Sequence, residues 1–150
     1  MKCNSDKDKE IEDYLCDVCT RPAAQKMKCY IQHGKISTYD HCRNVVEFSC
    51  WIDKVLHLRA DRGTLVKGAM LHDLFLYDWH DGSHRLHGFT HAEEAARNAE
   101  RLFGVDQATR HVISSHMWPL NLTHIPRSRE AWIVCGADKM VSLYESIFGR

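Results

Sequence analysis

The chain has 150 residues, the usual size of one domain with a single hydrophobic core. Apolar residues make up 44% of it and charged residues 27%, a balance that excludes a disordered or fibrous chain. The 20 basic and 20 acidic side chains cancel, and no apolar run approaches the length that crosses a bilayer. Neither nucleic acid nor a membrane is therefore an expected partner.

Residues 1–30 are expected to form a leader segment that packs on a domain spanning residues 31–150. The first ten residues lack the apolar stretch of a signal peptide, which predicts a cytoplasmic protein. A short helical period runs from Ile11 to Val18. Cys16 and Cys19 have the spacing of half a zinc site, but only Cys29 lies nearby, and a structural site needs four ligands. The seven cysteines are expected to be reduced thiols.

From Tyr39 onward the pattern is helical, and strand-like alternation is nowhere sustained. A first long helix is expected from Ser37 or Thr38, both good N-caps, to about Leu58, with His41 on its apolar stripe. A second helix is expected over about residues 62–75. It places the doublet His72-Asp73 on its inner face, near its C-terminal end.

A polar loop is expected over residues 77–88, because this segment has two glycines and no apolar period. Thr90 is then expected to cap a third helix, with Glu93 at the capping-box position. Gly104 is expected to end this helix. His91 lies on its apolar face, so a third helix brings a histidine to the core.

The last two expected helices repeat this arrangement. The fourth begins after Asp106, is stopped by Pro119 and carries His116 on its apolar stripe. The fifth begins at about Ser128 and places Asp138 among apolar neighbours. Both helices are therefore expected to bury a side chain of a type that binds metals.

Histidine or aspartate thus lies on the buried side of five successive helices. A lone inward histidine is most often a hydrogen-bonded core residue, but a buried carboxylate without a partner is costly. Imidazole nitrogen and carboxylate oxygen are ligands that zinc, manganese and iron accept, so a cation would satisfy all six side chains together. The eleven histidines of the chain also favour metal or proton chemistry. The six candidates are His41, His72, Asp73, His91, His116 and Asp138.

In this order the six residues resemble the H…HD…H…H…D signature of the HD-domain superfamily of metal-dependent phosphohydrolases, over Tyr39 to Glu145. Residues 71–80, 87–91 and 116–120 are also similar to a subgroup of small bacterial HD proteins described as hydrolases without a stated substrate. The resemblance implies an all-α, single-domain helical bundle of the HD type.

The resemblance also implies a ligand set. His41, His72, Asp73 and Asp138 would hold a first metal, and Asp73 would bridge to a second held by His91 and His116. Some related groups have two adjacent histidines where this chain has His116-Met117. One or two divalent transition-metal ions are therefore expected, with manganese, iron, zinc, cobalt or nickel as candidates.

Two ions that share a carboxylate acidify a bound water and neutralise charge on a reacting phosphate. The expected activity is hydrolysis of a small phosphate ester, such as a nucleotide or cyclic nucleotide, by a phosphomonoesterase or phosphodiesterase mechanism. Asp73 and His87 are the expected catalytic residues, with His87 the candidate general acid from a loop that also offers Asp78, His80, Asp81 and His84. Candidate phosphate contacts are Lys35, Arg129 and Lys139, followed by Arg43 and Arg127.

Two other function classes fit the same residues. A di-iron oxygenase of the HD type uses the same ligand set, and a non-catalytic module would use metal and pocket to hold a nucleotide-like effector. Oxygen consumption after iron loading would distinguish the oxygenase from a hydrolase. Turnover of phosphate esters would distinguish a hydrolase from the non-catalytic module. Exposed aromatics such as Trp51 or Trp118 are candidates for a homodimer face, with a core role as the equal alternative.

Overall fold

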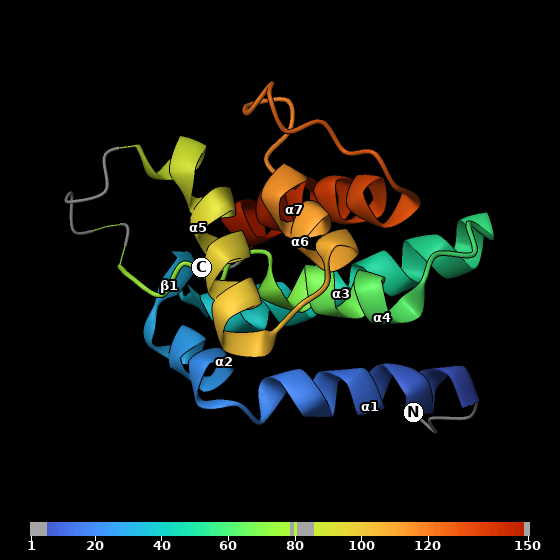
Figure 1. Ribbon diagram of the computed structural model, residues 1–150. Coiled ribbons are helices and arrows are strands. Elements are labelled where there is room, and N and C mark those ends of the chain that lie inside the picture. Colours follow the sequence, from blue (N-terminus) through green and yellow to red (C-terminus); the bar gives the residue numbers. More distant parts are fainter. Residues whose placement is uncertain (1–5, 79, 81–85, 149–150) are drawn as a thin grey trace.

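The computed structural model describes residues 6–78, 80 and 86–148. Within these ranges it confirms the expected all-α class, with helices packed around one core and one small hairpin (Figure 1). The helices and strands are α1 (Asp6–Cys19), α2 (Pro22–Lys26), the short 3₁₀ helix η1 (Met27–Cys29), β1 (Ile31–His33), β2 (Ile36–Ser37), α3 (Thr38–Leu56), α4 (Arg62–Leu71), α5 (His87–Phe103), α6 (Gln107–Ser115) and α7 (Arg129–Phe148).

Three helices begin where side-chain caps were expected or available. Ser37 accepts a hydrogen bond from the Asp40 amide at the start of α3. Asp61 accepts one from Thr64 at the start of α4, and Asp106 accepts one from Thr109 at the start of α6. Each cap satisfies one of the amides that the first turn of a helix leaves without a partner.

The expected start of the third long helix is wrong. The helix α5 already begins at His87, so Thr90 lies inside it and donates its hydroxyl hydrogen to the Leu86 carbonyl oxygen rather than capping the helix. Glu93 does not complete a capping box, because its carboxylate accepts a hydrogen bond from Arg110 of α6 at 2.6 Å. This ion pair joins α5 to α6, a role that local sequence spacing does not reveal.

The hairpin β1–β2 was also not expected. Its strands have three and two residues, too few to show an alternating pattern, and they pair antiparallel across a turn in which Gly34 has a φ of 58°. Glycine adopts this left-handed conformation without steric cost. The hairpin matters because β1 carries Gln32, which reaches the centre of the molecule.

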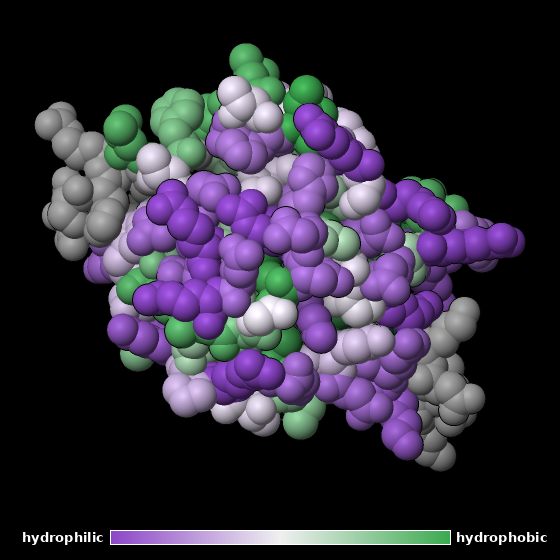
Figure 2. All heavy atoms as spheres, viewed as in Figure 1, coloured by the Kyte–Doolittle hydropathy of each residue, from purple (hydrophilic) through white to green (hydrophobic). Residues whose placement is uncertain are grey.

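The helices α3 and α7 run antiparallel and pack against each other. His41 at the start of α3 contacts Glu145 near the end of α7, and Leu58 just past α3 contacts Arg129 at the start of α7. The helices α4 and α6 cover one side of this pair, and α1 lies along α4 (Figure 1). Hydrophilic residues dominate the face in Figure 2, which looks at the α4 and α6 side.

Close packing of α4 on α6 depends on a glycine. A Cβ at Gly68 would lie 2.6 Å from Cγ1 of Val112, a buried and β-branched side chain that has little room to turn. We expect Gly68→Ala to lower the free energy of unfolding by about 1–3 kcal/mol through overpacking. Urea denaturation measures this change.

The matched control is Gly136→Ala on α7, where a Cβ would meet no atom within 4 Å. Alanine is the better helix former, so this variant should be about 0.5–1 kcal/mol more stable than the natural chain. Equal effects at the two positions would show that helix propensity, and not the approach of α4 to α6, decides the result.

Among the described residues, no helix has the length and apolar character needed to cross a membrane.

Candidate metal centre

The structure brings all six candidate residues together in the interior. His41 comes from the first turn of α3, His72 and Asp73 follow the last turn of α4, and His91 lies in α5. His116 follows the last turn of α6, and Asp138 lies in the middle of α7. None of the six is more than 7% exposed, so five helices deliver polar side chains to one buried point, called here the central cluster.

The first half of the central cluster lies between α3, α4 and α7. Nε2 of His41 lies 3.2 Å from Oδ1 of Asp138 and 3.8 Å from Oδ2 of Asp73. Nε2 of His72 lies 3.5 Å and 3.4 Å from the same two oxygens. Two nitrogens and two oxygens therefore face a common centre, which is the donor set of a tetrahedral or larger coordination shell.

The second half uses the other oxygen of the same aspartate. Oδ1 of Asp73 lies 3.3 Å from Nε2 of His91 and 3.5 Å from Nε2 of His116, and these two nitrogens are 3.1 Å apart. Asp73 thus directs one carboxylate oxygen to each half. This is the arrangement expected of a carboxylate that bridges two ions.

Hydrogen bonds at the far side of the rings set which nitrogens face inward. Nδ1 of His72 lies 2.7 Å from the Ala69 carbonyl oxygen, and Nδ1 of His116 lies 2.7 Å from the Ile113 carbonyl oxygen. A carbonyl oxygen only accepts, so each Nδ1 carries the hydrogen and donates it. The Nε2 atoms of both rings therefore present lone pairs to the central cluster.

A cation fits this donor set. The inward atoms are imidazole lone pairs and carboxylate oxygens, and two of them, Nε2 of His72 and Oδ1 of Asp73, make no hydrogen bond although both are buried. A buried polar atom without a partner costs about 1–3 kcal/mol. A metal ion removes this cost because it accepts lone pairs from nitrogen and oxygen together. The buried groups that could hold a metal include His41, His72 and Asp138, and also His72, Asp73 and His116.

The pKa values in the central cluster show the same attraction for positive charge. Burial favours neutral His41, but its hydrogen bonds to Asp138 and Glu145 outweigh burial and raise its pKa to about 10. Burial alone would raise the pKa of Asp138, yet the neighbouring His41 and His72 hold it well below its usual range. The carboxylates therefore stay ionised and stabilise positive charge beside them, whether it is a proton on an imidazole or a metal ion.

An outer carboxylate, which the sequence did not lead us to expect, orients His41. Oε2 of Glu145 lies 2.7 Å from Nδ1 of His41, and Oε1 accepts a hydrogen bond from Asn44 at 2.8 Å. Glu145 is buried, and burial would raise the pKa of its carboxyl, but the bonds to His41 and Asn44 lower it. An ionised Glu145 accepts the Nδ1 hydrogen and holds Nε2 toward Asp138, where a metal ion would take the place of the Nε2 hydrogen.

A second outer contact comes from the hairpin. Nε2 of Gln32 donates to Oδ2 of Asp73 at 2.6 Å, and Oε1 of Gln32 accepts a longer bond from the Thr38 hydroxyl. His33 stacks edge-on against His41 with ring centroids 5.5 Å apart. The hairpin therefore closes one side of the central cluster and restrains the bridging carboxylate.

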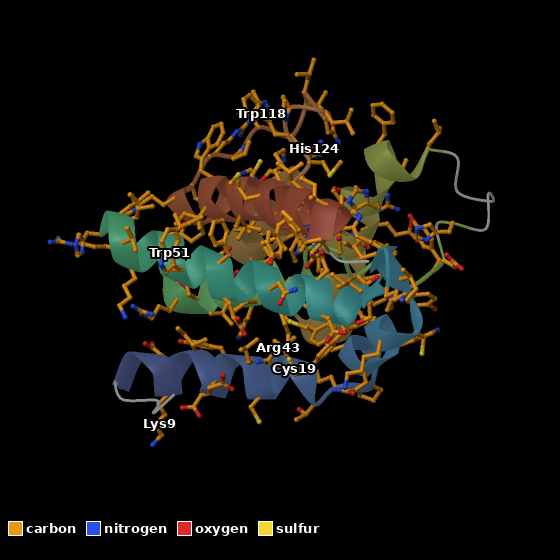
Figure 3. All side chains as sticks on the ribbon, turned by 180° about the vertical axis from the view of Figure 1, so that it is seen from behind. Lys9, Cys19, Arg43, Trp51, Trp118 and His124 are labelled. Carbon is orange, nitrogen blue, oxygen red and sulfur yellow. The ribbon has the colours of Figure 1, made fainter. Side chains whose placement is uncertain are left out.

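The basic residues expected at a substrate phosphate have different surroundings. Arg129 donates to the carbonyl oxygens of Leu58 and Arg59, at the opposite end of α3 from His41 and about 25 Å along the helix. This corrects the expectation for Arg129, because its guanidinium stabilises the turn after α3. Arg43 points toward Cys19 between α3 and α1 (Figure 3).

The two expected lysines lie nearer the central cluster. Lys139 follows Asp138, and its Nζ donates to the His116 carbonyl oxygen at 2.8 Å. Lys35 is exposed in the hairpin turn next to the strand that carries Gln32 and His33. The side chain of His87, the expected general acid, lies outside the described residues, as do Asp81 and His84.

The thiols take no part in these groups. Among the described residues, none of the sets of three or more side chains able to hold a metal includes a cysteine. The buried Cys42 contacts one of the histidines, with Sγ 3.7 Å from Nδ1 of His72. The half zinc site suggested by Cys16 and Cys19 therefore finds no support.

A model of the protein family described as the HD domain matches residues 38–142. The chain belongs to the HD-domain family. The matched residues include all six members of the central cluster, as the sequence pattern predicted, and leave out Gln32 and Glu145. Comparison with curated proteins and with solved structures gives no match. The HD family is one of mainly metal-dependent hydrolases, and this chain keeps buried histidines and aspartates that could hold a metal.

Proposed function

We propose that this HD-domain chain is a metal-dependent phosphohydrolase that cleaves a small phosphate ester with water. The observation that carries the proposal is the position of Asp73, whose two carboxylate oxygens each face a separate set of imidazole nitrogens. Membership of the HD family supports the same chemistry. A nucleotide or cyclic nucleotide is the substrate class to test first.

Some residues would hold the metal ions, and others orient the side chains that hold them. His41, His72 and Asp138 would hold one divalent ion, His91 and His116 a second, and Asp73 both. Such ions supply an acidified water and neutralise negative charge on the phosphate. Gln32 and Glu145 keep Asp73 and His41 in the required orientation and tautomer.

The remaining roles concern substrate and proton transfer. In hydrolysis, the oxygen of water forms a bond to phosphorus, the ester P–O bond breaks, and the leaving oxygen takes a proton. His87 stays the proposed proton donor. It is the first residue of α5 and precedes His91 by four residues in the same helix. Lys35 and Lys139 are the proposed phosphate contacts, since Lys139 follows Asp138 in the chain and Lys35 lies in the turn of the hairpin whose Gln32 binds Asp73.

Turnover of defined phosphate esters tests this proposal. The metal-free chain is loaded in turn with manganese, iron, cobalt, nickel and zinc, and release of phosphate or nucleoside is followed for nucleoside monophosphates, cyclic nucleotides and a chromogenic phosphodiester. We expect at least one pairing to be turned over, with a loss of at least about 100-fold in Asp73→Ala. Asp17→Ala, an exposed aspartate of α1, should keep full activity.

Two outcomes would contradict the hydrolase. Consumption of dioxygen by the iron-loaded chain, without hydrolysis of any ester, would assign the same donor set to an oxygenase. Tight nucleotide binding to every metal form, without turnover, would assign it to a binding module.

A further inference from the structure

The helix α7 is apolar on both of its sides. Its inner side buries Ile133, Val134 and Ala137 in the core. Its outer side, near the C-terminal end, leaves five large apolar side chains between 53% and 67% exposed, namely Met140, Leu143, Tyr144, Ile147 and Phe148. A helix that is apolar all round is normally covered on both sides.

An aromatic side chain of α3 extends this surface. Trp51 is 54% exposed and stacks on Phe48, with ring centroids 5.4 Å apart and an interplanar angle of 9°. Between α3 and α7 lies a hollow of about 600 Å³ that both Trp51 and Tyr144 line. Figure 3 looks at this side of the α3–α7 pair and labels Trp51. The surface of Trp51, Met140, Leu143, Tyr144, Ile147 and Phe148 is called here the outer apolar face.

The area of the outer apolar face matches that of a protein–protein contact. Six side chains that are each more than half exposed, at about 200 Å² for a large side chain, present roughly 600–700 Å². A standard specific interface buries about 800 Å² on each partner, and the largest apolar patch of a typical monomer is about 300–600 Å². The face is large enough to form most of one side of a dimer contact.

The α7 part of the outer apolar face also lacks exposed charge. From Met140 to Phe148 the sequence contains one charged residue, Glu145, and its carboxylate is buried against His41 and Asn44. A two-fold contact places the same surface against itself, and an uncharged surface does so without bringing like charges together. An anionic lipid surface would instead be met by lysine or arginine, which this stretch of α7 does not have.

We propose that the outer apolar face binds a second copy of this chain in a symmetric dimer. The partner would also cover the hollow between α3 and α7, whose lining includes Asn44 and Glu145.

Sedimentation velocity and light scattering on the full, metal-loaded chain test the proposal over a micromolar concentration series. We expect a mass twice the 17.4 kDa of one chain. The double variant Leu143→Glu, Ile147→Glu should raise the dissociation constant at least about 100-fold, because association would bury charges without partners. Leu122→Glu, at a residue 72% exposed outside α3 and α7, is the matched control and should leave the dimer intact.

Circular dichroism and metal content establish that each variant is folded. Trp51→Lys gives an independent test from α3 if the double variant fails to fold. This variant too should be monomeric. A natural chain that is monomeric throughout the series, or a double variant as dimeric as the natural chain, would overturn the proposal. Cosedimentation of a monomeric natural chain with phosphatidylcholine vesicles would also overturn it, and would assign the face to lipid.

Discussion

Replacing Asp73 with asparagine is expected to remove both metal ions, whereas His116→Ala removes only one. Asp73 offers one oxygen to each half of the central cluster, so its loss affects both. Nε2 of His116 lies near Oδ1 of Asp73 and Nε2 of His91, the donor atoms of the second half. Elemental analysis of protein purified without chelator should find about two ions in the natural chain, about one in His116→Ala and close to none in Asp73→Asn.

The comparison is specific because Asp73→Asn removes the negative charge of the side chain and leaves its volume nearly unchanged. Asp53→Asn is the matched control. Asp53 is also a buried aspartate, but its carboxylate accepts a hydrogen bond from the Ala60 amide in the turn after α3, and the asparagine oxygen can replace it there. If Asp73→Asn kept one ion, or His116→Ala lost both, Asp73 would not be a bridge.

Glu145→Ala should weaken metal binding by about 10–100-fold although Glu145 contacts no ion in the proposed site. The variant takes away the acceptor at Nδ1 of His41, so the ring is free to turn or to change tautomer, and Nε2 is no longer held toward Asp138. Breaking this buried pair should also lower the stability of the metal-free chain by about 3–5 kcal/mol. Competition with a chromogenic chelator gives the affinity, and urea unfolding gives the stability.

Two milder variants separate orientation from simple loss of packing. Glu145→Gln keeps a carbonyl oxygen for Nδ1 of His41 and should recover most of the metal affinity. Asn44→Ala removes only the second hydrogen bond of Glu145 and should change the affinity less than Glu145→Ala. Equal affinities in Glu145→Ala and the natural chain would show that His41 needs no outer carboxylate.

The sequence predicted the helices and the six residues of the central cluster because both depend on local pattern. Caps such as Asp106 and apolar stripes at helical spacing mark where helices begin and which side is buried. His41 and Asp138 lie on such stripes, and the family match over residues 38–142 confirms the membership that their order indicated. Their role as metal ligands stays a prediction.

The outer contacts were missed for two different reasons. Glu145 follows Asp138 by seven residues, two helical turns, so a signal existed in the spacing, but an acidic residue near a helix end is ordinarily solvated. Gln32 had no usable signal, because it reaches Asp73 from a hairpin whose two strands hold only five residues, 41 positions earlier in the chain. Contacts of such long sequence separation follow from tertiary packing and not from periodicity.

His72 and His116 share a position that bears on how the central cluster is built. Each is the C-terminal cap of its helix, and each donates Nδ1–H to the carbonyl oxygen three residues earlier. The direction of the imidazole is therefore set by the rotational phase of the helix backbone. One residue inserted into α4 or α6 would turn the ring by about 100°, and no side-chain rotamer could bring Nε2 back. The lengths of α4 and α6 are thus a requirement of the metal centre itself, whereas surface loops are free to change in length.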